Sequence, residues 1–347
     1  MLELKQALRS LGQGVLLSGV DLTFTGEAPT SILGLGASGR DLLLKLLAGN
    51  EKLRGGEIRL GGRDIAQARR GKLRITQVGP AGMAKSGQKV GKILDAGMAG
   101  RVGLSARLSA PVSQLDAEER VRLALGKAMQ DQPALLLLDA PTSAMTPDQR
   151  GRFTADLGQM VSGARGVVVL LAGGADEAMG MGGRTVVLSE GRVQQAGPIA
   201  EVFAAPANLA SAVATAWPSL NTLTMTMDAG RGRLSDGTSL TPPQGVSLPA
   251  SGPCVLAFRP DDSTMARETP GCVRFIVRAI GEQQISAQTY KRLGFAGQTW
   301  LSPLVAAEPP PPGAVLNLFV DRGKVLVFDG AGAAMLPPAS NGGAATG

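Results

Sequence analysis

The stretch that most constrains this chain is Ser31 to Gly49, SILGLGASGRDLLLKLLAG. An apolar, strand-like run at Ile32 and Leu33 enters a loop with glycines at positions 34, 36 and 39, and the loop opens into an amphipathic helix. This order is typical of a phosphate-binding loop, whose glycines let backbone N–H groups surround an anion at a helix N-terminus. The stretch therefore predicts a strand, a phosphate-binding turn and a helix.

The loop keeps the glycine spacing and changes the working side chains. The pattern G-x-x-x-x-G-K-[ST] places a lysine on the β- and γ-phosphates and a hydroxyl group on Mg²⁺. Gly34 and Gly39 hold the glycine positions, but Arg40 replaces the lysine and Asp41 replaces the hydroxyl residue. Two interpretations of Arg40 stay open: a phosphate clamp, or a surface cation that closes the loop onto Asp41 or a neighbour. Asp41 is predicted to be a helix N-cap rather than a Mg²⁺ ligand.

The middle of the loop is altered as well. Ala37 adds a methyl group where the backbone would approach a phosphate closely. The candidate phosphate-binding residues are Gly34, Gly36, Ala37, Ser38, Gly39, Arg40 and Asp41.

The rest of the first 217 residues predicts an α/β sheet, because strands alternate with helices. Residues 1–30 alternate apolar and polar positions, which indicates an antiparallel patch. The expected strands are 58–60, 73–79, 135–138, 167–171 and 185–188, and the expected helices are 117–130 and 149–162. Asp116 is the predicted N-cap of the 117–130 helix, and residues 80–114 show only weak helical periodicity.

Residues 218–332 have a different sequence pattern: short runs of alternating apolar and polar residues, separated by Gly and Pro, replace the helical periodicity. This predicts a small all-β domain of barrel or sandwich type. Residues 333–347 read as a disordered tail. The expected strands are 223–227, 255–258, 273–277, 315–319 and 324–328.

Composition excludes several function classes. The net charge of +7 comes from scattered basic residues, and the 3% aromatic content leaves little for bases to stack on, so nucleic acid is not an expected partner. Cys254 and Cys272, in a chain without histidine, predict buried free thiols and no metal site. The N-terminus lacks a signal-peptide core and no long apolar run appears, so a cytoplasmic location is expected.

Taken together, these segments resemble the ATP-binding subunit of an ABC transporter, of the importer type with a C-terminal OB-like (TOBE-type) domain that serves sugars, polyols and related solutes. The resemblance implies a RecA-like P-loop core, an antiparallel β patch and a helical subdomain, followed by the OB-like domain. The stretches that carry it are 32–49, 114–144, 184–208, 256–262 and 316–332.

The resemblance also implies which positions should bind nucleotide, and several of them are altered. The adenine-stacking aromatic falls on Leu11. The Q-loop glutamine falls on Pro80, and Gln77 takes its role only if the preceding loop is shortened. The signature Leu-Ser-Gly-Gly-Gln becomes Leu115, Asp116, Ala117, Glu118 and Glu119. Three carboxylates there would repel the γ-phosphate held by a partner subunit, by about 1 kcal/mol per pair at water-like screening.

Only one catalytic side chain of the family remains. The Walker B strand ends in Asp139, a Mg²⁺ ligand in the family, and the next residue, the general-base position, is Ala140. A methyl group accepts no proton from water. The switch histidine falls on Gly173. Asp139 is therefore interpreted as a leftover that supports the loop, with Mg²⁺ binding as the alternative, and no other metal site is expected.

The predicted function is a degenerate, non-catalytic subunit of an importer for a sugar, polyol or glycerol-like solute. Its implied partners are a second, catalytic ABC ATPase subunit, the transmembrane permease and, indirectly, a solute-binding protein, on the cytoplasmic side of the inner membrane. The family implies ATP and Mg²⁺, and the altered residues argue against both at this chain's own site. A weakly active ATPase and a regulatory or scaffold protein stay open as alternatives, as do the solute, the dimer type and regulator binding by the β domain.

Overall fold

The computed structural model describes residues 1–347 except 12–13, 35–37, 71–72, 236, 242–245, 266–269, 286–287, 305–309 and 336–347, and it leaves the side chains of 10–16 and 69–72 undescribed. The chain divides into two compact units, Met1–Val202 and Phe203–Gly347. Each unit has its own hydrophobic core. No helix among the described residues is both long and apolar enough to cross a bilayer.

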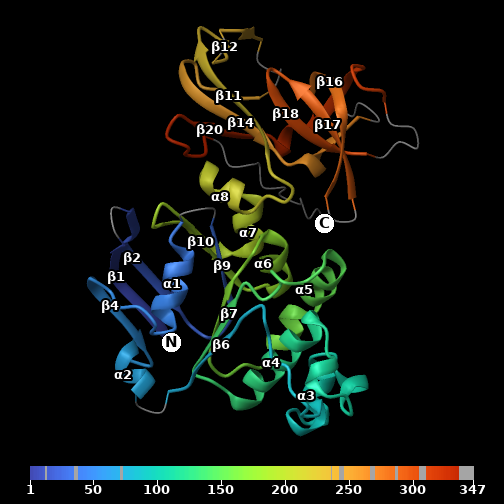
Figure 1. The fold of residues 1–347 in the computed structure, drawn as a ribbon. Helices are drawn as coiled ribbons and strands as arrows, with labels where there is room; N and C mark the ends of the chain where they lie inside the picture. The colour runs from blue at the N-terminus through green and yellow to red at the C-terminus, as the bar shows by residue number, and fades with distance from the viewer. Residues whose placement is uncertain are drawn as a thin grey trace, which may run out of the picture. The chain divides into compact units, whose positions relative to one another are not determined.

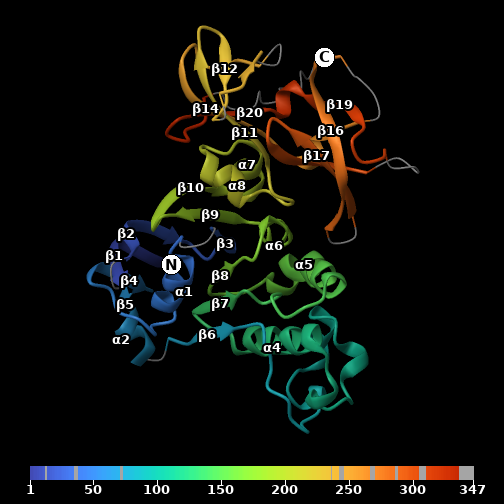
Figure 2. The same cartoon turned by 45° about the horizontal axis from the view of Figure 1, so that its top comes forward.

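A six-stranded, mainly parallel sheet forms the centre of the first unit, in the order β10-β9-β3-β8-β7-β6 (Figure 2). β3, β6, β7, β8 and β9 are parallel neighbours, and β10 pairs antiparallel with β9. The strands are β3 (Thr30–Leu33), β6 (Ile75–Val78), β7 (Leu135–Asp139), β8 (Val167–Leu171), β9 (Arg184–Ser189) and β10 (Arg192–Pro198). The predicted α/β sheet is confirmed.

The central strands are apolar along their whole length because both faces of the sheet are covered. All residues of β8, and all of β7 before Asp139, are buried. The helix α1 (Arg40–Leu47) and an antiparallel sheet share a core with one face, and α4 to α6 lie on the other (Figure 1). Because β3, β6, β7, β8 and β9 are parallel, their carboxyl ends lie at the same edge of the sheet.

The antiparallel sheet has the strand order β2-β1-β4-β5. Its strands are β1 (Leu2–Leu11), β2 (Gly14–Phe24), β4 (Gly55–Leu60) and β5 (Arg63–Asp64). This confirms the antiparallel patch expected from residues 1–30.

The helices of the first unit and its boundary are α2 (Ile65–Arg70), α3 (Ala96–Arg101), α4 (Ala117–Asp131), α5 (Pro147–Val161), α6 (Ala175–Met181) and α7 (Ile199–Ala204). Short 3₁₀ turns at Val90–Lys92, Ser105–Arg107 and Val112–Gln114 complete the region that shows weak periodicity. α5 begins two residues earlier than predicted because Thr146 forms a capping box with Gln149 and Pro147 occupies the first turn.

The second unit is all-β apart from α8 (Leu209–Ala214), the C-terminal end of α7 and short 3₁₀ turns, as far as the structure describes it. Two antiparallel five-stranded sheets, β13-β12-β11-β14-β20 and β15-β19-β16-β17-β18, contribute to one core. Phe258, Phe275 and Trp300 are mutual ring neighbours at its centre. The expected all-β domain is confirmed as two packed sheets, and the OB-like assignment stays a prediction.

The strands of this unit are β11 (Asn221–Asp228), β12 (Arg231–Arg233), β13 (Ser239–Leu240), β14 (Gly252–Phe258), β15 (Ser263–Thr264), β16 (Cys272–Ile285), β17 (Gln288–Phe295), β18 (Gln298–Pro303), β19 (Val315–Asp321) and β20 (Leu326–Asp329). The strands β12, β13, β15, β17 and β18 are not predicted from the sequence. In β17, Lys291 follows Tyr290 and both are buried, which breaks the apolar–polar alternation. Buried Lys291 donates to the Pro310 carbonyl oxygen at 2.6 Å.

Three details at the ends of this unit differ from expectation. The units divide after Val202 rather than after residue 217, because Ala212 of α8 packs with residues of β14 and β20. Ala333 and Ala334 form β-bridges with Asn208 and Phe328, so the first residues of the expected tail are ordered, and 336–347 lie outside the described residues. Cys254 is buried as predicted, but Cys272 is only partly buried because it opens the long strand β16.

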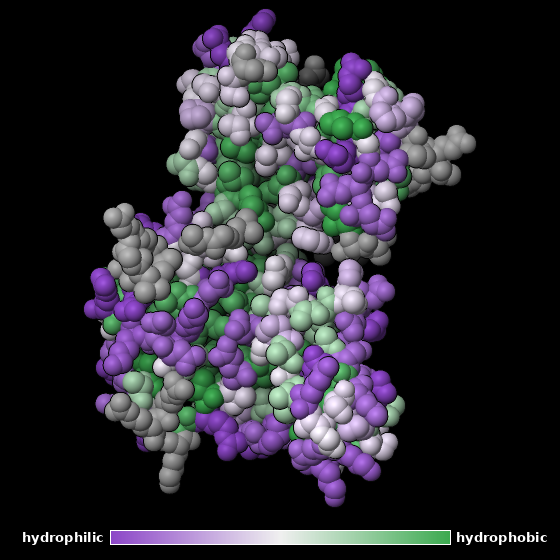
Figure 3. All heavy atoms as spheres, in the orientation of Figure 1, coloured by the Kyte–Doolittle hydropathy of each residue, from purple (hydrophilic) through white to green (hydrophobic). Residues whose placement is uncertain are grey.

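Hydrophilic side chains are dispersed over the visible face of both units, with apolar patches between them (Figure 3).

Candidate functional site

Several of the predicted site residues, among them Gly34, Asp139 and Gly173, lie at the carboxyl edge of the parallel sheet. β3 leads into the glycine loop, β7 ends at Asp139, and β8 is followed by Ala172 and Gly173. Two backbone hydrogen bonds join these segments: Ala140 N–H donates to the Leu171 carbonyl oxygen at 3.2 Å, and Ala172 N–H donates to Ile32 at 3.1 Å. Three stretches far apart in the sequence thus form one edge.

The described part of the glycine loop has the form of an anion-binding turn. A Cβ atom at Gly34 would lie 2.6 Å from Ser38 Oγ and from the Leu188 carbonyl oxygen, so only glycine fits there. Gly39 has φ 88° and caps α1 without any side-chain hydrogen bond. Ser38 is 1% exposed and its hydroxyl has no partner among the described atoms. Residues 35–37, which include the predicted Gly36 and Ala37, lie outside the described residues.

Asp41 does not cap the helix, and this prediction is wrong. The N-cap is Gly39, because the helix begins at Arg40 and a residue inside its first turn cannot cap it. The Asp41 side chain is 74% exposed, and its Oδ1 lies 3.7 Å from Arg40 Nε.

Arg40 is turned toward the protein in this structure. Its Nη1 donates to the Ala172 carbonyl oxygen at 2.8 Å, which joins the start of α1 to the end of β8. This contact matches the second interpretation of Arg40, a cation that closes the loop onto a neighbour.

Asp139 is held by a glutamine of the neighbouring strand. Gln77 Nε2 donates to Asp139 Oδ2 at 2.8 Å, from β6, which pairs in parallel with β7. Pro80 lies in the turn that follows β6, where Gly82 N–H donates to the Gly79 carbonyl oxygen. Of the two positions considered for the Q-loop glutamine, only Gln77 has a side chain on the carboxylate.

The general-base position has an unusual backbone and no functional group. Ala140 has φ 43°, a conformation that costs a non-glycine residue on the order of 1 kcal/mol or more. The sharp bend directs the chain from β7 toward α5 while offering only a methyl group to solvent.

A buried carboxylate that sequence reasoning missed lies next to the switch position. Gly173 N–H donates to Glu177 Oε2 at 3.0 Å, and Thr142 Oγ1 donates to Glu177 Oε1. Glu177 is 2% exposed. Burial raises the pKa of this carboxyl group, and the hydrogen bonds from Gly173 and Thr142 oppose that rise. The only sequence signal was an acidic residue in the first turn of α6, which by itself points to a helix dipole.

The acids at the signature position serve the helix that they begin. Asp116 accepts from Glu119 N–H at 2.9 Å, and Glu119 Oε2 accepts from Asp116 N–H at 3.0 Å, a complete capping box. Arg107 Nε also donates a hydrogen bond to Glu119 Oε1 at 2.6 Å. The prediction that Asp116 caps this helix is confirmed.

Glu118 lies inside the helical region rather than at its surface. It is 5% exposed and pairs with Arg122 at 2.9 Å and with Arg152 at 2.8 Å. Leu115 is buried just before the helix, and Ala117 is its first residue. All three carboxylates have partners within the chain: Glu118 and Glu119 are ion-paired, and Asp116 is used as a cap.

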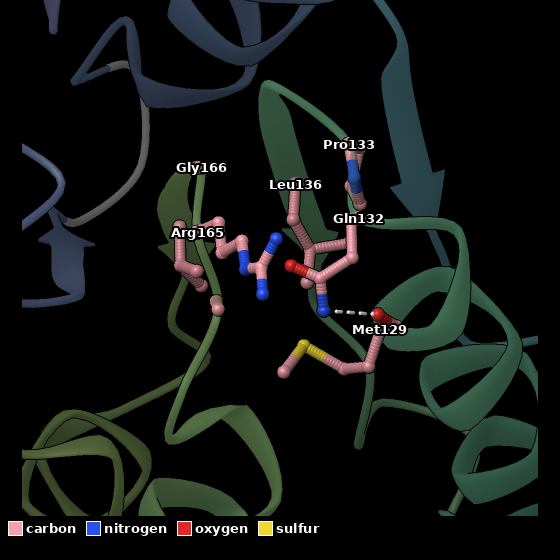
Figure 4. A pocket seen from close by; sticks show the side chains of 8 residues that line it. Met129, Gln132, Pro133, Leu136, Arg165 and Gly166 are labelled. Carbon is pink, nitrogen blue, oxygen red and sulfur yellow. Dashed lines mark hydrogen bonds between the residues drawn. The ribbon is translucent and has the colours of Figure 1, made fainter.

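Three hollows formed by described residues of the first unit lie away from this edge. A narrow crevice with no room for a water molecule lies between the C-terminal end of α4 and the start of β8, lined by Met129, Gln132, Pro133, Leu136, Arg165 and Gly166 among others (Figure 4). Two larger hollows of about 330 and 310 Å³ flank Gly26 and Gly166. All three lie at the amino ends of the parallel strands. None holds a predicted site residue.

The groups at this edge fit a phosphate better than they fit the Mg²⁺ ion that accompanies a nucleotide. The first amides of α1 have no side-chain cap and Ser38 has an unpartnered hydroxyl, which suits an anion. Mg²⁺ at a nucleotide site is held by one or two carboxylates together with phosphate oxygens and water, and Oδ2 of Asp139 at this edge accepts from Gln77. The side chain of Leu11, at the adenine position, lies outside the described side chains.

No family model matches the chain. Two curated proteins align with nearly all of it. The sn-glycerol-3-phosphate import ATP-binding protein UgpC 2 of Agrobacterium fabrum is 25% identical over 94% of this chain and 92% of that protein. The Fe(3+) ions import ATP-binding protein FbpC of Streptomyces avermitilis is 26% identical over 96% of this chain and 100% of that protein. The sulfate/thiosulfate import ATP-binding protein CysA of Mycobacterium bovis is 31% identical over 58% of this chain and 62% of that protein.

Solved structures match the first unit. The cbiO1 subunit of the cbiONQ ABC transporter complex of Clostridium perfringens superposes with a TM-score of 0.51 at 21% identity, over 58% of this chain and 90% of that one. The ATP-binding cassette MJ1267 in its ADP conformation gives a TM-score of 0.50 at 15% identity, over 59% of this chain and 95% of that one. The fold is that of a P-loop ABC ATPase, and the chain is similar along its length to the ATP-binding subunits of ABC importers.

Proposed function

We propose that this chain is a degenerate, non-catalytic nucleotide-binding subunit of an ABC importer. The observation that carries the proposal is that two residues at the sheet edge lack a side chain able to transfer a proton. Ala140 replaces the general base and Gly173 replaces the switch histidine, and neither side chain accepts or donates a proton. Loss of a general base lowers a rate by roughly two to four orders of magnitude.

The nearest carboxylate does not replace the missing base. Glu177 is buried, and both of its oxygens accept hydrogen bonds from within the chain, one from Gly173 and one from Thr142. A base must be within hydrogen-bond reach of the water that it activates. An enclosed carboxylate that is already paired on both oxygens does not meet that condition.

Hydrolysis is then the task of a second, catalytic ABC subunit, with which this chain pairs beneath the permease at the inner face of the membrane. Intact scaffolding supports this assembly role, since the sheet, the helical region and the all-β unit are all present. The capped N-terminus of α4 makes a poor γ-phosphate contact, because the Asp116 and Glu119 side chains already accept from two of the backbone amides there. The assembled importer is therefore expected to turn over slowly, or to have a partner that tolerates this helix.

The solute is proposed to be a sugar, a polyol or a glycerol-like compound. One aligned relative is named for sn-glycerol-3-phosphate, and others are named for ferric ions and for sulfate or thiosulfate. The glycerol-like class is the one that both the resemblance and a full-length relative support.

The test uses the importer purified through a tag on this chain. Asp139→Asn in this chain should leave the ATPase activity of the complex within about twofold of the wild type, because the chain's own site does not perform the chemistry. The matched substitution in the Walker B aspartate of the co-purified ATPase should abolish activity. A loss of tenfold or more from Asp139→Asn in this chain would contradict the proposal and favour a working, if weak, ATPase.

A further inference from the structure

The carboxylate that would face a metal ion is already bound. Gln77 Nε2 donates to Asp139 Oδ2 at 2.8 Å. The hydrogen bond is charge-assisted, because the acceptor is a carboxylate, and such bonds are stronger than those between neutral groups. Gln77 lies on β6, at the edge of the six-stranded sheet, and β6 is held in register against β7 by four residue pairs. The amide is thus fixed to a rigid element beside Asp139.

The second potential ligand is no better placed. Asp41 stands where a hydroxyl residue would bind the metal, but its side chain is 74% exposed and its Oδ1 lies 3.7 Å from Arg40 Nε. A guanidinium group beside a carboxylate competes with a cation for the same oxygens. Both carboxylates at this edge therefore have a donor or a cationic neighbour from the chain itself.

The N–H and O–H groups that would bind an anion at the same edge have no side-chain partner among the described atoms. α1 begins at Gly39 without a side-chain cap, and the Ser38 hydroxyl is buried and unpartnered among the described atoms. The amino end of a helix attracts negative charge through its free N–H groups. The phosphate donors at this edge thus have no side-chain partner among the described atoms, whereas one oxygen of Asp139 accepts from Gln77 and Asp41 lies beside Arg40.

We infer that the Gln77 amide takes the place of the divalent metal at Asp139, so that a nucleotide bound at α1 is bound without Mg²⁺. Gln77 is a positioning residue in this assignment, because it acts through Asp139. The inference deepens the proposed function and rests on it, because both describe a subunit that binds a nucleotide without hydrolysing it. A site without its metal is consistent with such a subunit.

The test is a titration of the full-length chain with Mn²⁺, followed by electron paramagnetic resonance of the free ion. The wild type should show no saturable binding below about millimolar Mn²⁺. Gln77→Ala frees the carboxylate and should raise the affinity about tenfold, and Gln77→Glu, which puts an acceptor in place of the donor, should raise it at least as much. The Asp139→Asn substitution added to either variant should remove the gain. Gln67→Ala, at an exposed glutamine of α2, is the matched control and should change nothing.

Two results would overturn the inference. One is saturable Mn²⁺ binding by the wild type that Gln77→Ala abolishes, because the glutamine would then be a ligand rather than a substitute for the ion. The other is a failure of both Gln77 variants to gain affinity while their circular dichroism remains that of the wild type.

A nucleotide titration provides an independent readout. The dissociation constants of ATP with excess Mg²⁺ and with EDTA should agree within about threefold, and a preference of tenfold or more for Mg-ATP would contradict the inference. These outcomes are separate from those of the proposed function, which is tested by hydrolysis. A chain that hydrolyses ATP would fail as a non-catalytic subunit even if Mn²⁺ did not bind at Asp139.

Discussion

At the scale of single residues, the polar side chains of the site contact other groups of the chain itself. Arg40 donates to a backbone carbonyl oxygen, Asp139 accepts from Gln77, and Glu177 is enclosed by Thr142 and Gly173. Each of these groups is satisfied within the chain. A polar edge whose groups are paired internally stabilises the fold and leaves little chemistry for a bound molecule.

Glu177 gives a prediction for pH dependence. Its pKa is raised above the ordinary value of 4.5, mainly by burial. A carboxyl group with a raised folded-state pKa binds its proton more tightly in the folded chain, so folding stability falls as pH rises from 4.5 through the raised value. Glu177→Gln should therefore gain stability relative to the wild type between pH 4.5 and neutral pH, measured by urea unfolding. Glu201→Gln, at an exposed site, should show no such trend. A constant difference across this pH range would contradict the assignment.

At the scale of elements, α1 and α4 differ in how their N-termini are capped. In the family that the chain resembles, the N-termini of both helices contact phosphate. α1 begins without a side-chain cap, whereas α4 begins with a complete capping box. Two amides at the start of α4 are therefore used by its own side chains. This explains why the acidic residues at this position are compatible with a stable helix.

The capping box predicts a measurable cost. Asp116→Ala removes the acceptor for Glu119 N–H and should lower the free energy of unfolding by about 1 kcal/mol. Asp116→Asn keeps an acceptor and should stay within a few tenths of a kcal/mol of the wild type. Both are measured by urea unfolding at neutral pH. Equal stability of the Asp116→Ala variant and the wild type would show that the box contributes nothing.

Local signals predicted elements well and contacts poorly. The apolar runs of β7 and β8 and the Asp116 cap were evident because each depends on neighbouring residues. The Gln77–Asp139 bond joins residues 62 apart, and the Glu177 enclosure joins two loops, so neither has a local pattern. β17 was missed for a similar reason, since buried Lys291 is satisfied by the distant Pro310.

At the scale of the whole molecule, the chain has the fold of a P-loop ABC ATPase in its first unit and two packed antiparallel sheets in its second. The parallel sheet, the antiparallel sheet, the helical region and an all-β second unit are present. In the proposed role, Ala140 and Gly173 are the two positions at the sheet edge that activate no water. Selection for docking and pairing without selection for hydrolysis would give this combination, and it places the proposed role in the assembled importer.

The most direct measurement is the steady-state turnover of ATP by the purified full-length chain with saturating Mg²⁺, compared with its Asp139→Asn variant. The account predicts that turnover stays at least about a hundredfold below the roughly 1 s⁻¹ at the low end for enzymes, and that the variant gives the same residual rate as the wild type. Turnover near 1 s⁻¹ that Asp139→Asn abolishes would contradict it, because the chain would then possess a working catalytic site.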